Sequence, residues 1–321
     1  MDKEKKLKIL QLMLTARCME ERMMKMAKSA DAFFWMGGIG EEGLNVPLGL
    51  LSRPGYGLDY DFFHLHYRDS AAMIAMGIDP ADPIRQSHNR ATDPYSGGRN
   101  FCQHYAIKKW NVMPITSPIG IQCSIAPGSA LAQKRHGGEG ISICTFGDAG
   151  TAEGDFHIGL NWATLFNQQL PILFICKNNL FGISTGYNEV HGQEHLTEIA
   201  AGYGMETGLV DGNDVEASYA AISKAMKYVR KERKPYFLEA KVSRLYGHSS
   251  SSGGNRIPLD KEVDPVFAWR DKLIEQGVIT REEYDAIYES QTARMRELLE
   301  QVRKEPAPQP EDIYKNIFVS A

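Results

Sequence analysis

The sequence predicts a doubly wound α/β fold, with a mainly parallel sheet and helices on both faces. Two observations predict this fold. Strand-like apolar runs, ISICTF from Ile141 and ILFICK from Ile172, flank a helical stretch from about Gly154 to Phe166, which is the pattern of a βαβ unit. The alternation then repeats, with a short strand in METGLVDG, a helix in DVEASYAAISKAMKYVRKER that begins near Asp214, and a strand in PYFLEAKVSR.

The segment before this core predicts an amphipathic helix, because Leu7, Leu10, Leu14 and Cys18 recur at helical spacing. A methionine-rich extension of this face runs toward Ser29. It has two interpretations, a face of the chain's own core, which we favour, or a contact surface for another subunit.

Residues 53–120 are rich in glycine, proline, aspartate and aromatic residues, and they contain only short helical stretches, SAAMIAMG and DPIRQSHNR. Loops of this kind usually build a site. After Asp264 two amphipathic helices follow, in PVFAWRDKLIEQG and REEYDAIYESQTARMRELLEQVRKE, before a PAPQP run and a short tail. We therefore expect an N-terminal helical extension at 1–52, an α/β domain at 53–262, and a C-terminal helical extension and tail at 263–321.

Charge and composition argue for small-molecule chemistry or protein partners. The net charge of −4 over 321 residues indicates neither a nucleic-acid footprint nor a patch for anionic membranes. Charged residues interrupt the apolar residues of the N-terminus, unlike a signal peptide or a membrane span. The cysteines form no CxxC pair, which predicts reduced thiols and a cytoplasmic location; they are Cys18, Cys102, Cys123, Cys144 and Cys176.

Oxygen-bearing side chains follow two successive strands of the predicted sheet. Asp148 comes just after one strand, and a pair of asparagines ending at Asn179 comes just after the next. The carboxyl ends of parallel strands share one edge, so both side chains are expected to converge on one ligand. Magnesium suits this position, because it is held by one or two protein oxygens together with the phosphates of a ligand. A carbonyl near Phe181 adds an oxygen, while Gly147 and Gly150 allow close backbone approach and lead into a helix whose N-terminus favours an anion.

The plain alternative is that GD and NN each begin a turn for backbone reasons. Taken singly, each pair favours this interpretation. Their spacing across one βαβ unit, with an apolar strand directly before each, favours a shared site instead. The sequence therefore predicts a magnesium and diphosphate site.

This run resembles the thiamine diphosphate motif that begins GDG and ends NN about thirty residues later. The chain as a whole resembles the α subunits of 2-oxo acid dehydrogenases, which implies their thiamine diphosphate-binding fold. The resemblance covers most of the chain and rests on runs that occur in the family's order: GEEGLNVPLGL, HYRDSAAMIAMGI, ATDPYSGGRNF, TSPIGIQ, CTFGDAGTAEGDFH, FICKNNLFGIST, DGNDVEASY and YGHSS.

The resemblance implies roles for individual residues. Asp148, Asn179 and the Phe181 carbonyl match the family's magnesium ligands. His248 in YGHSS matches a histidine of a mobile loop that orders over the diphosphate and the reacting centre, so it is the expected catalytic residue. Lys177, where some relatives carry Arg, is expected to add charge more loosely. The further cofactor contacts that it implies are Tyr67 and Arg68 at the diphosphate, Ser117 and Ile119 along the cofactor, and Gly147, Ala149 and Gly150 in the motif's first loop.

The chain departs from the family pattern in three places. Ala149 replaces the motif's second glycine, which would crowd the diphosphate or oppose a positive φ angle if the loop needs one, with Gly150 as the residue to relieve that strain. The run GGRNFC, where many relatives have GGRQMP, changes a substrate-facing loop that contains Phe101 and His104. Ile121 stands where some relatives use a threonine hydroxyl for potassium, which weakens the case for that ion.

The resemblance implies that this chain decarboxylates a 2-oxo acid together with a β subunit, in an α2β2 assembly. A lipoyl-bearing acyltransferase would receive the acyl group. The glutamate that activates the cofactor comes from the β subunit in this family, and neither Glu41 nor Glu42 matches it, so the chain alone is expected to be inactive. Branched-chain 2-oxo acids are the first choice of substrate, with pyruvate and acetoin enzymes as alternatives.

Two other classes of function are alternatives. A nicotinamide-dependent dehydrogenase also has a doubly wound core, but its GxGxxG turn, with an acidic residue about 20 positions on, is not expected here. A cofactor-binding paralogue without activity is the other alternative, and only Ala149 and the GGRNFC loop favour it.

Overall fold

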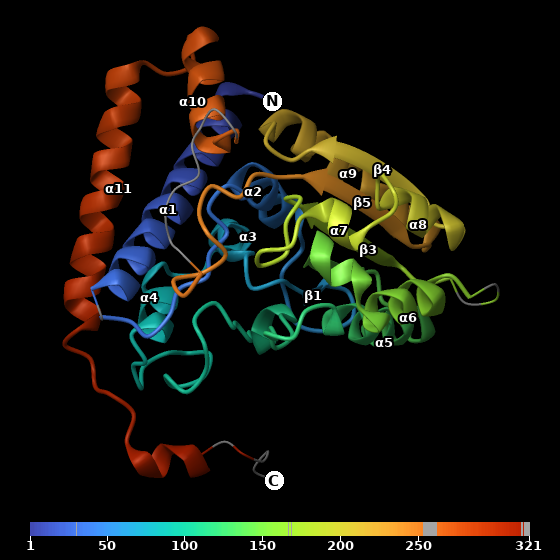
Figure 1. The fold of residues 1–321 in the computed structure, drawn as a ribbon, viewed down its shortest axis with the longest axis horizontal. Coiled ribbons are helices and arrows are strands. Elements are labelled where there is room, and N and C mark those ends of the chain that lie inside the picture. The colour runs from blue at the N-terminus through green and yellow to red at the C-terminus, as the bar shows by residue number, and fades with distance from the viewer. Residues whose placement is uncertain (30, 166, 168, 253–261, 316, 318–321) are drawn as a thin grey trace.

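The sheet at the centre of the molecule has five parallel strands in the order β1-β2-β3-β5-β4. Figure 1 shows this computed structural model, which describes residues 1–29, 31–165, 167, 169–252, 262–315 and 317. The arrangement confirms the predicted parallel α/β sheet. The strands are β1 (Phe62–His64), β2 (Ser142–Gly147), β3 (Ile172–Asn178), β4 (Glu206–Asp211) and β5 (Tyr236–Lys241).

Helices precede, connect and follow the strands. The predicted helix after β2 ends at Ala163, and Phe166 lies outside the described residues. The α-helices are α1 (Lys3–Lys28), α2 (Glu42–Leu51), α3 (Ser70–Met76), α4 (Ala81–Ser87), α5 (Ile121–Arg135), α6 (Gly154–Ala163), α7 (Tyr187–Val190), α8 (Thr197–Gly202), α9 (Val215–Glu232), α10 (Pro265–Glu275) and α11 (Arg281–Val302). Short 3-10 helices are η1 (Lys108–Trp110), η2 (Asp148–Ala152) and η3 (Pro310–Tyr314).

The sheet buries both of its faces at β2, β3 and β5, because successive side chains of these strands enter two different cores, whereas Leu209 of the edge strand β4 is 53% exposed. On β2, Cys144 and Phe146 pack with α5 and α6, whereas Ile143 packs into the core that includes α1, α2, α3 and α9. β3 alternates in the same way, with Phe174 on the first side and Ile175 on the second. Helices therefore cover both faces, as predicted (Figure 1).

The methionine-rich face of α1 belongs to the chain's own core. Met19, Met23 and Met26 are buried, and α1 runs beside α11 on the left of Figure 1. Asp2 caps the helix by accepting a hydrogen bond of 2.8 Å from the Lys5 amide. The interpretation of this face as core is thereby confirmed.

Gly38, Gly40 and Gly43 match the letters GxGxxG just before and at the start of α2, so the expectation that such a run is lacking was wrong. The element before them is the helix α1, whereas a dinucleotide turn follows a strand. A Cβ atom at Gly38 would lie 2.2 Å from the Arg68 carbonyl oxygen, and one at Gly40, where φ is +106°, would lie 2.4 Å from the Ser243 carbonyl oxygen. The glycines thus allow close packing against the segments that follow β1 and β5.

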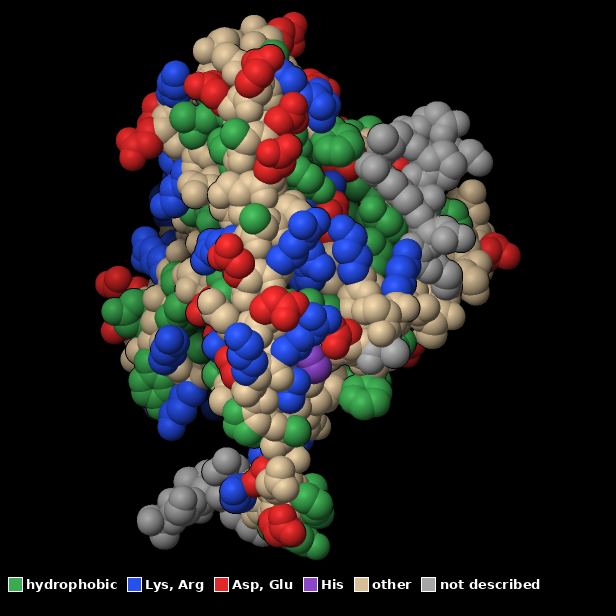
Figure 2. Space-filling view, turned by 90° about the vertical axis from the view of Figure 1, so that its left-hand side faces the viewer, with side chains coloured by type: hydrophobic (Ala, Val, Ile, Leu, Met, Phe, Trp, Pro, Cys, Tyr) green, Lys and Arg blue, Asp and Glu red, His purple; other side chains and the backbone are tan. Residues whose placement is uncertain are grey.

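The surface carries charges of both signs. Figure 2 shows basic and acidic side chains interspersed over the face formed by α11, with the C-terminal segment standing away from the body at its base. Ile313 and Tyr314 of that segment are exposed. No helix among the described residues combines the length and apolarity needed to cross a membrane. The five cysteines are free and buried, and the division of the chain at residues 52 and 262 stays a prediction.

Candidate active site

A cavity of about 510 Å³ lies where the strands end. All eleven residues that the resemblance had connected with the cofactor line it. They are Tyr67, Arg68, Ser117, Ile119, Gly147, Asp148, Ala149, Gly150, Asn179, Phe181 and His248. Glu41, Lys177 and Arg244 line it as well.

The sheet brings these residues together at its carboxyl edge. Asp148 follows β2 directly and begins η2, and Asn179 follows β3 directly. The two strands are paired so that Gly147 lies opposite Lys177, and this register places Asp148 beside the end of β3. The other asparagine of the pair, Asn178, turns away and donates a hydrogen bond of 2.8 Å to Glu239.

Asp148 is a buried carboxylate that forms no ion pair with any described residue. Burial raises its pKa to about 7, against the opposing effect of nearby backbone amides and the Arg244 cation. Its own carbonyl accepts hydrogen bonds from the Thr151 hydroxyl at 2.7 Å and is 3.2 Å from His191 Nε2, which fixes the backbone of this loop. A cation at this position would keep the carboxylate ionised.

A tight turn carries Asn179 and Phe181. Asn179 Oδ1 accepts a hydrogen bond of 3.1 Å from the Phe181 amide, and Leu180 between them has φ of +65°. The described residues contain no cluster of three or more His, Cys, Asp or Glu side chains that could hold a metal. The donors are instead one carboxylate, one amide oxygen and nearby backbone carbonyls. This set fits magnesium that shares its coordination with ligand phosphates.

Ala149 adopts the loop without backbone strain. It lies within η2, and neither it nor Gly150 is among the described residues with positive φ. The positive φ that the glycine of the motif would have allowed is therefore not required here, and Gly150 has no strain to relieve.

Arg68 and His248 form one hydrogen-bonded unit at the cavity wall. Arg68 donates through Nη2 to His248 Nδ1 at 3.1 Å and to the His248 carbonyl at 3.0 Å, and through Nη1 to the Gly37 carbonyl. Burial, aided by the Arg68 and Arg244 cations, lowers the pKa of His248 to about 4. A guanidinium can only donate, so Nδ1 is the acceptor and the proton of the neutral ring sits on Nε2.

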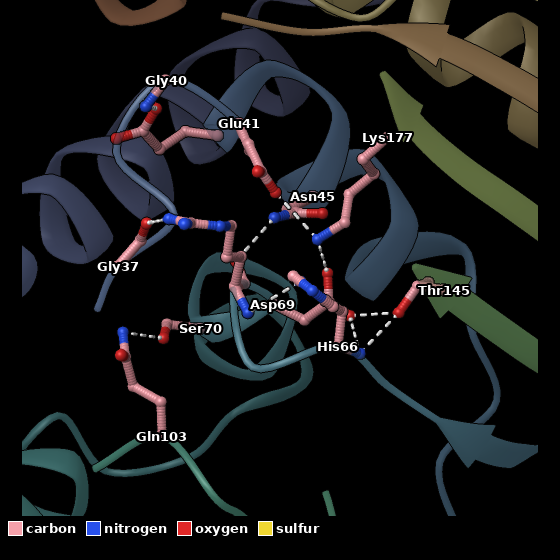
Figure 3. A network of polar contacts seen from close by, with 12 residues as sticks. Gly37, Gly40, Glu41, Asn45, His66, Asp69, Ser70, Gln103, Thr145 and Lys177 are labelled. Carbon is pink, nitrogen blue, oxygen red and sulfur yellow. Dashed lines mark hydrogen bonds and ion pairs between the residues drawn. The ribbon is translucent and has the colours of Figure 1, made fainter. Parts of the chain in front are cut away.

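Lys177 does not add charge loosely to the cavity, as the sequence had suggested. Its ammonium group is buried, 2.6 Å from Asp69 Oδ1 and 2.7 Å from Glu41 Oε2 (Figure 3). Asp69 Oδ2 accepts hydrogen bonds from the His66 amide at 2.9 Å and from the Thr145 hydroxyl. Lys177 therefore supports the loop after β1, which carries Tyr67 and Arg68, and its charge is already balanced.

His104 holds the Ser117 hydroxyl. Its Nε2 lies 2.7 Å from Ser117 Oγ, and its Nδ1 lies 2.9 Å from the Cys102 carbonyl. A carbonyl can only accept, so Nδ1 carries the proton and Nε2 accepts from the Ser117 hydroxyl. Burial lowers the pKa of His104 and favours this neutral ring. The sequence placed His104 in a substrate-facing loop but gave no signal for this contact.

Sequence reasoning missed Arg244 and His191. Arg244 lies just beyond β5, where the strand position alone was a usable signal. His191 follows α7, and nothing in its neighbourhood of the sequence indicates a contact with the Asp148 loop.

Fold and site together define a doubly wound α/β protein with a cavity suited to a metal-bound diphosphate. The chain belongs to the dehydrogenase E1 component family, whose model matches residues 10–311. This result confirms the predicted family. Its members are oxidoreductase components, and the family implies thiamine diphosphate as the cofactor.

Individual relatives align along nearly the whole chain. The 2-oxoisovalerate dehydrogenase subunit alpha of Bacillus subtilis is 29% identical over 313 residues, which are 95% of this chain and 93% of the relative. The mitochondrial 2-oxoisovalerate dehydrogenase subunit alpha of Homo sapiens is 29% identical over 324 residues, which are 98% of this chain and 71% of the relative. The mitochondrial protein of Dictyostelium discoideum with the same description is 28% identical over 325 residues, 98% of this chain and 72% of the relative.

Proposed function

We propose that this chain is the α subunit of a 2-oxo acid dehydrogenase and that it binds thiamine diphosphate through Mg²⁺ in the 510 Å³ cavity. The single observation that carries the proposal is Asp148, a buried carboxylate without an ion-pair partner among the described residues, beside Asn179 at the carboxyl edge of the sheet. Such a carboxylate is costly to bury unless a cation joins it.

Asp148, Asn179 and the Phe181 carbonyl would hold the metal in this proposal. Arg68 would hold the diphosphate, because a guanidinium suits phosphate oxygens. When bound, thiamine diphosphate supplies the carbanion that adds to the 2-oxo carbon and the ring that accepts the electrons released with carbon dioxide. The remaining contacts are assigned to Tyr67, Ser117, Ile119, Gly147, Ala149 and Gly150, all in the cavity wall.

His248 acts as a neutral donor in the proposed reaction. Arg68 occupies its Nδ1 atom, so the proton on Nε2 is the one that it can offer to a reacting oxygen. Its low pKa keeps the ring neutral near pH 7, and it therefore adds no further positive charge to the cavity.

The proposed partners are a β subunit in an α2β2 assembly and a lipoyl-bearing acyltransferase. The ion pair of Glu41 supports a β subunit as the source of the activating glutamate. The Glu41 carboxylate is paired with Lys177 at the cavity wall, so the activating glutamate must come from elsewhere. The substrate is a branched-chain 2-oxo acid, in line with the names of the aligned relatives. Pyruvate and acetoin remain the alternatives. The buried, free cysteines support a cytoplasmic location.

Calorimetric titration of thiamine diphosphate into the chain, co-expressed with a candidate β subunit, tests the proposal. Binding is expected with Mg²⁺ and is expected to fall sharply with a chelator. A decarboxylation assay that compares 2-oxoisovalerate with pyruvate then decides the substrate. Absence of magnesium-dependent binding in the assembled protein refutes the proposed function, and faster turnover of pyruvate refutes the substrate.

A further inference from the structure

Two guanidinium groups at the cavity wall have no carboxylate partner. Arg68 and Arg244 both line the cavity, and neither forms an ion pair with any described residue. Guanidinium groups that line one cavity and form no ion pair favour an anion as the ligand that completes the site.

Arg244 is held in place but keeps hydrogen-bonding capacity. Its Nη1 donates to the Gly182 carbonyl at 2.6 Å, and its guanidinium carbon lies 5.1 Å from the centre of the Phe181 ring. Its buried Nε has no hydrogen-bond partner among the described residues. A guanidinium has five N–H donors, so these contacts leave most of them for a ligand.

Lys177, the third cationic side chain that lines the cavity, already has ion-pair partners. Lys177 is paired with Asp69 and Glu41, so a bound diphosphate gains little from its charge. Without a second guanidinium, Arg68 would be the only uncompensated side-chain cation among the described residues that line the cavity.

We propose that Arg244 is the second arginine of the diphosphate subsite and takes the place that the sequence had suggested for Lys177. This inference rests on the proposed function. Arg244 also touches the turn that carries Phe181, so it couples the metal-binding segment to the phosphate-binding side of the cavity. Planar donors suit phosphate oxygens better than a single ammonium does.

The test compares ligands with and without phosphate on the full chain, in the assembly in which it is purified. Thiamine diphosphate and thiamine are titrated by calorimetry, in the presence of Mg²⁺, into wild type, Arg244→Gln and Arg270→Gln. Arg270 is the matched control, because its guanidinium carbon also lies over a phenylalanine ring, 4.6 Å from the centre of Phe267, but on α10.

Arg244→Gln is expected to weaken thiamine diphosphate binding by about 10- to 100-fold, the effect of losing a charge-assisted hydrogen bond. Binding of thiamine, which lacks phosphate, is expected to stay within about twofold, and Arg270→Gln is expected to bind both ligands as wild type does. An equal loss for both ligands would assign Arg244 to the Phe181 turn alone and overturn the inference.

The same titrations separate this inference from the proposed function. If wild type binds thiamine diphosphate and Arg244→Gln binds it equally well, only the inference is overturned. If wild type binds no thiamine diphosphate, the proposed function fails, and the inference fails with it.

Discussion

Replacing Lys177 by methionine removes the one cation shared by two buried carboxylates. The side chains of Lys177, Glu41 and Asp69 are 1%, 3% and 0% exposed. Methionine keeps much of the volume of lysine but leaves both carboxylates unpaired. Removal of one partner of a buried ion pair costs about 3–5 kcal/mol. We therefore expect Lys177→Met to lower the free energy of unfolding by about 3–5 kcal/mol.

Thermal unfolding of the cofactor-free protein measures this loss. At roughly 2 °C per kcal/mol for a chain of this size, the midpoint should fall by about 6–10 °C. Lys177→Arg, which keeps the charge, is the control and should lose less than half as much. A Lys177→Met midpoint within about 2 °C of wild type would refute the structural role of the network.

The pH dependence of the same variant gives a second check. Burial raises the pKa of Glu41, and the variant loses the Lys177 ammonium that opposes this effect, so the folded variant binds a proton at Glu41 more tightly than the unfolded chain does. Its deficit relative to wild type should therefore be small near pH 4 and should grow as the pH rises toward 8. A deficit that stays constant over this range would show that lost packing, rather than uncompensated charge, is the cause.

Three further predictions concern the cavity and its supports. Asp148→Asn should abolish magnesium-dependent cofactor binding in calorimetry and raise the unfolding midpoint, because burial raises the pKa of this carboxyl to about 7; retained binding would exclude it as a metal ligand. Glu20 of α1 is a buried carboxyl that accepts hydrogen bonds from Trp35 Nε1 at 2.9 Å and Gln103 Nε2 at 2.6 Å. Burial raises its pKa from 4.5 to about 7, so its contribution to stability is complete below pH 4.5 and is lost, by about 3 kcal/mol, as the pH rises through 7. Glu20→Gln should flatten that slope in urea titrations at several pH values, and an unchanged slope would contradict the assignment. His104→Ala should weaken cofactor affinity by up to about tenfold, and His104→Gln should recover most of that affinity. Adding Ser117→Ala to His104→Ala should cause no further loss, and additive losses would disprove the coupling of the two side chains.

Most of the fold was predictable, because apolar periodicity located β2, β3, β5, α6 and α9. The strand β1 and the helices α2, α5, α7 and α8 were missed, and three of them were missed for a local reason. β1 spans three residues, which is too short to show a period of two. Pro47 lies inside α2, and Pro127 lies inside α5, so residues that usually end a helix hid both helices.

The candidate site was likewise predictable only in part. Asp148 and Asn179 were predictable because the position of a residue after a parallel strand fixes the edge at which it lies. The face of the sheet toward which the Lys177 side chain points could also be predicted. The period of two along a strand places Lys177 on the same face as Ile175 and opposite Cys176. Its partners were not, because Asp69 is 108 residues away and only the folded chain brings the two together.

The wide separation of Asp69 and Lys177 along the chain has a consequence for biosynthesis. A ribosome that adds about 5–20 residues per second completes the loop after β1 roughly 5–20 s before Lys177 is made. During that interval the Asp69 carboxylate has no ammonium to meet, and the nascent loop stays hydrated. The loop that carries Tyr67 and Arg68 therefore gains the support of Lys177 only after a further 108 residues have been translated.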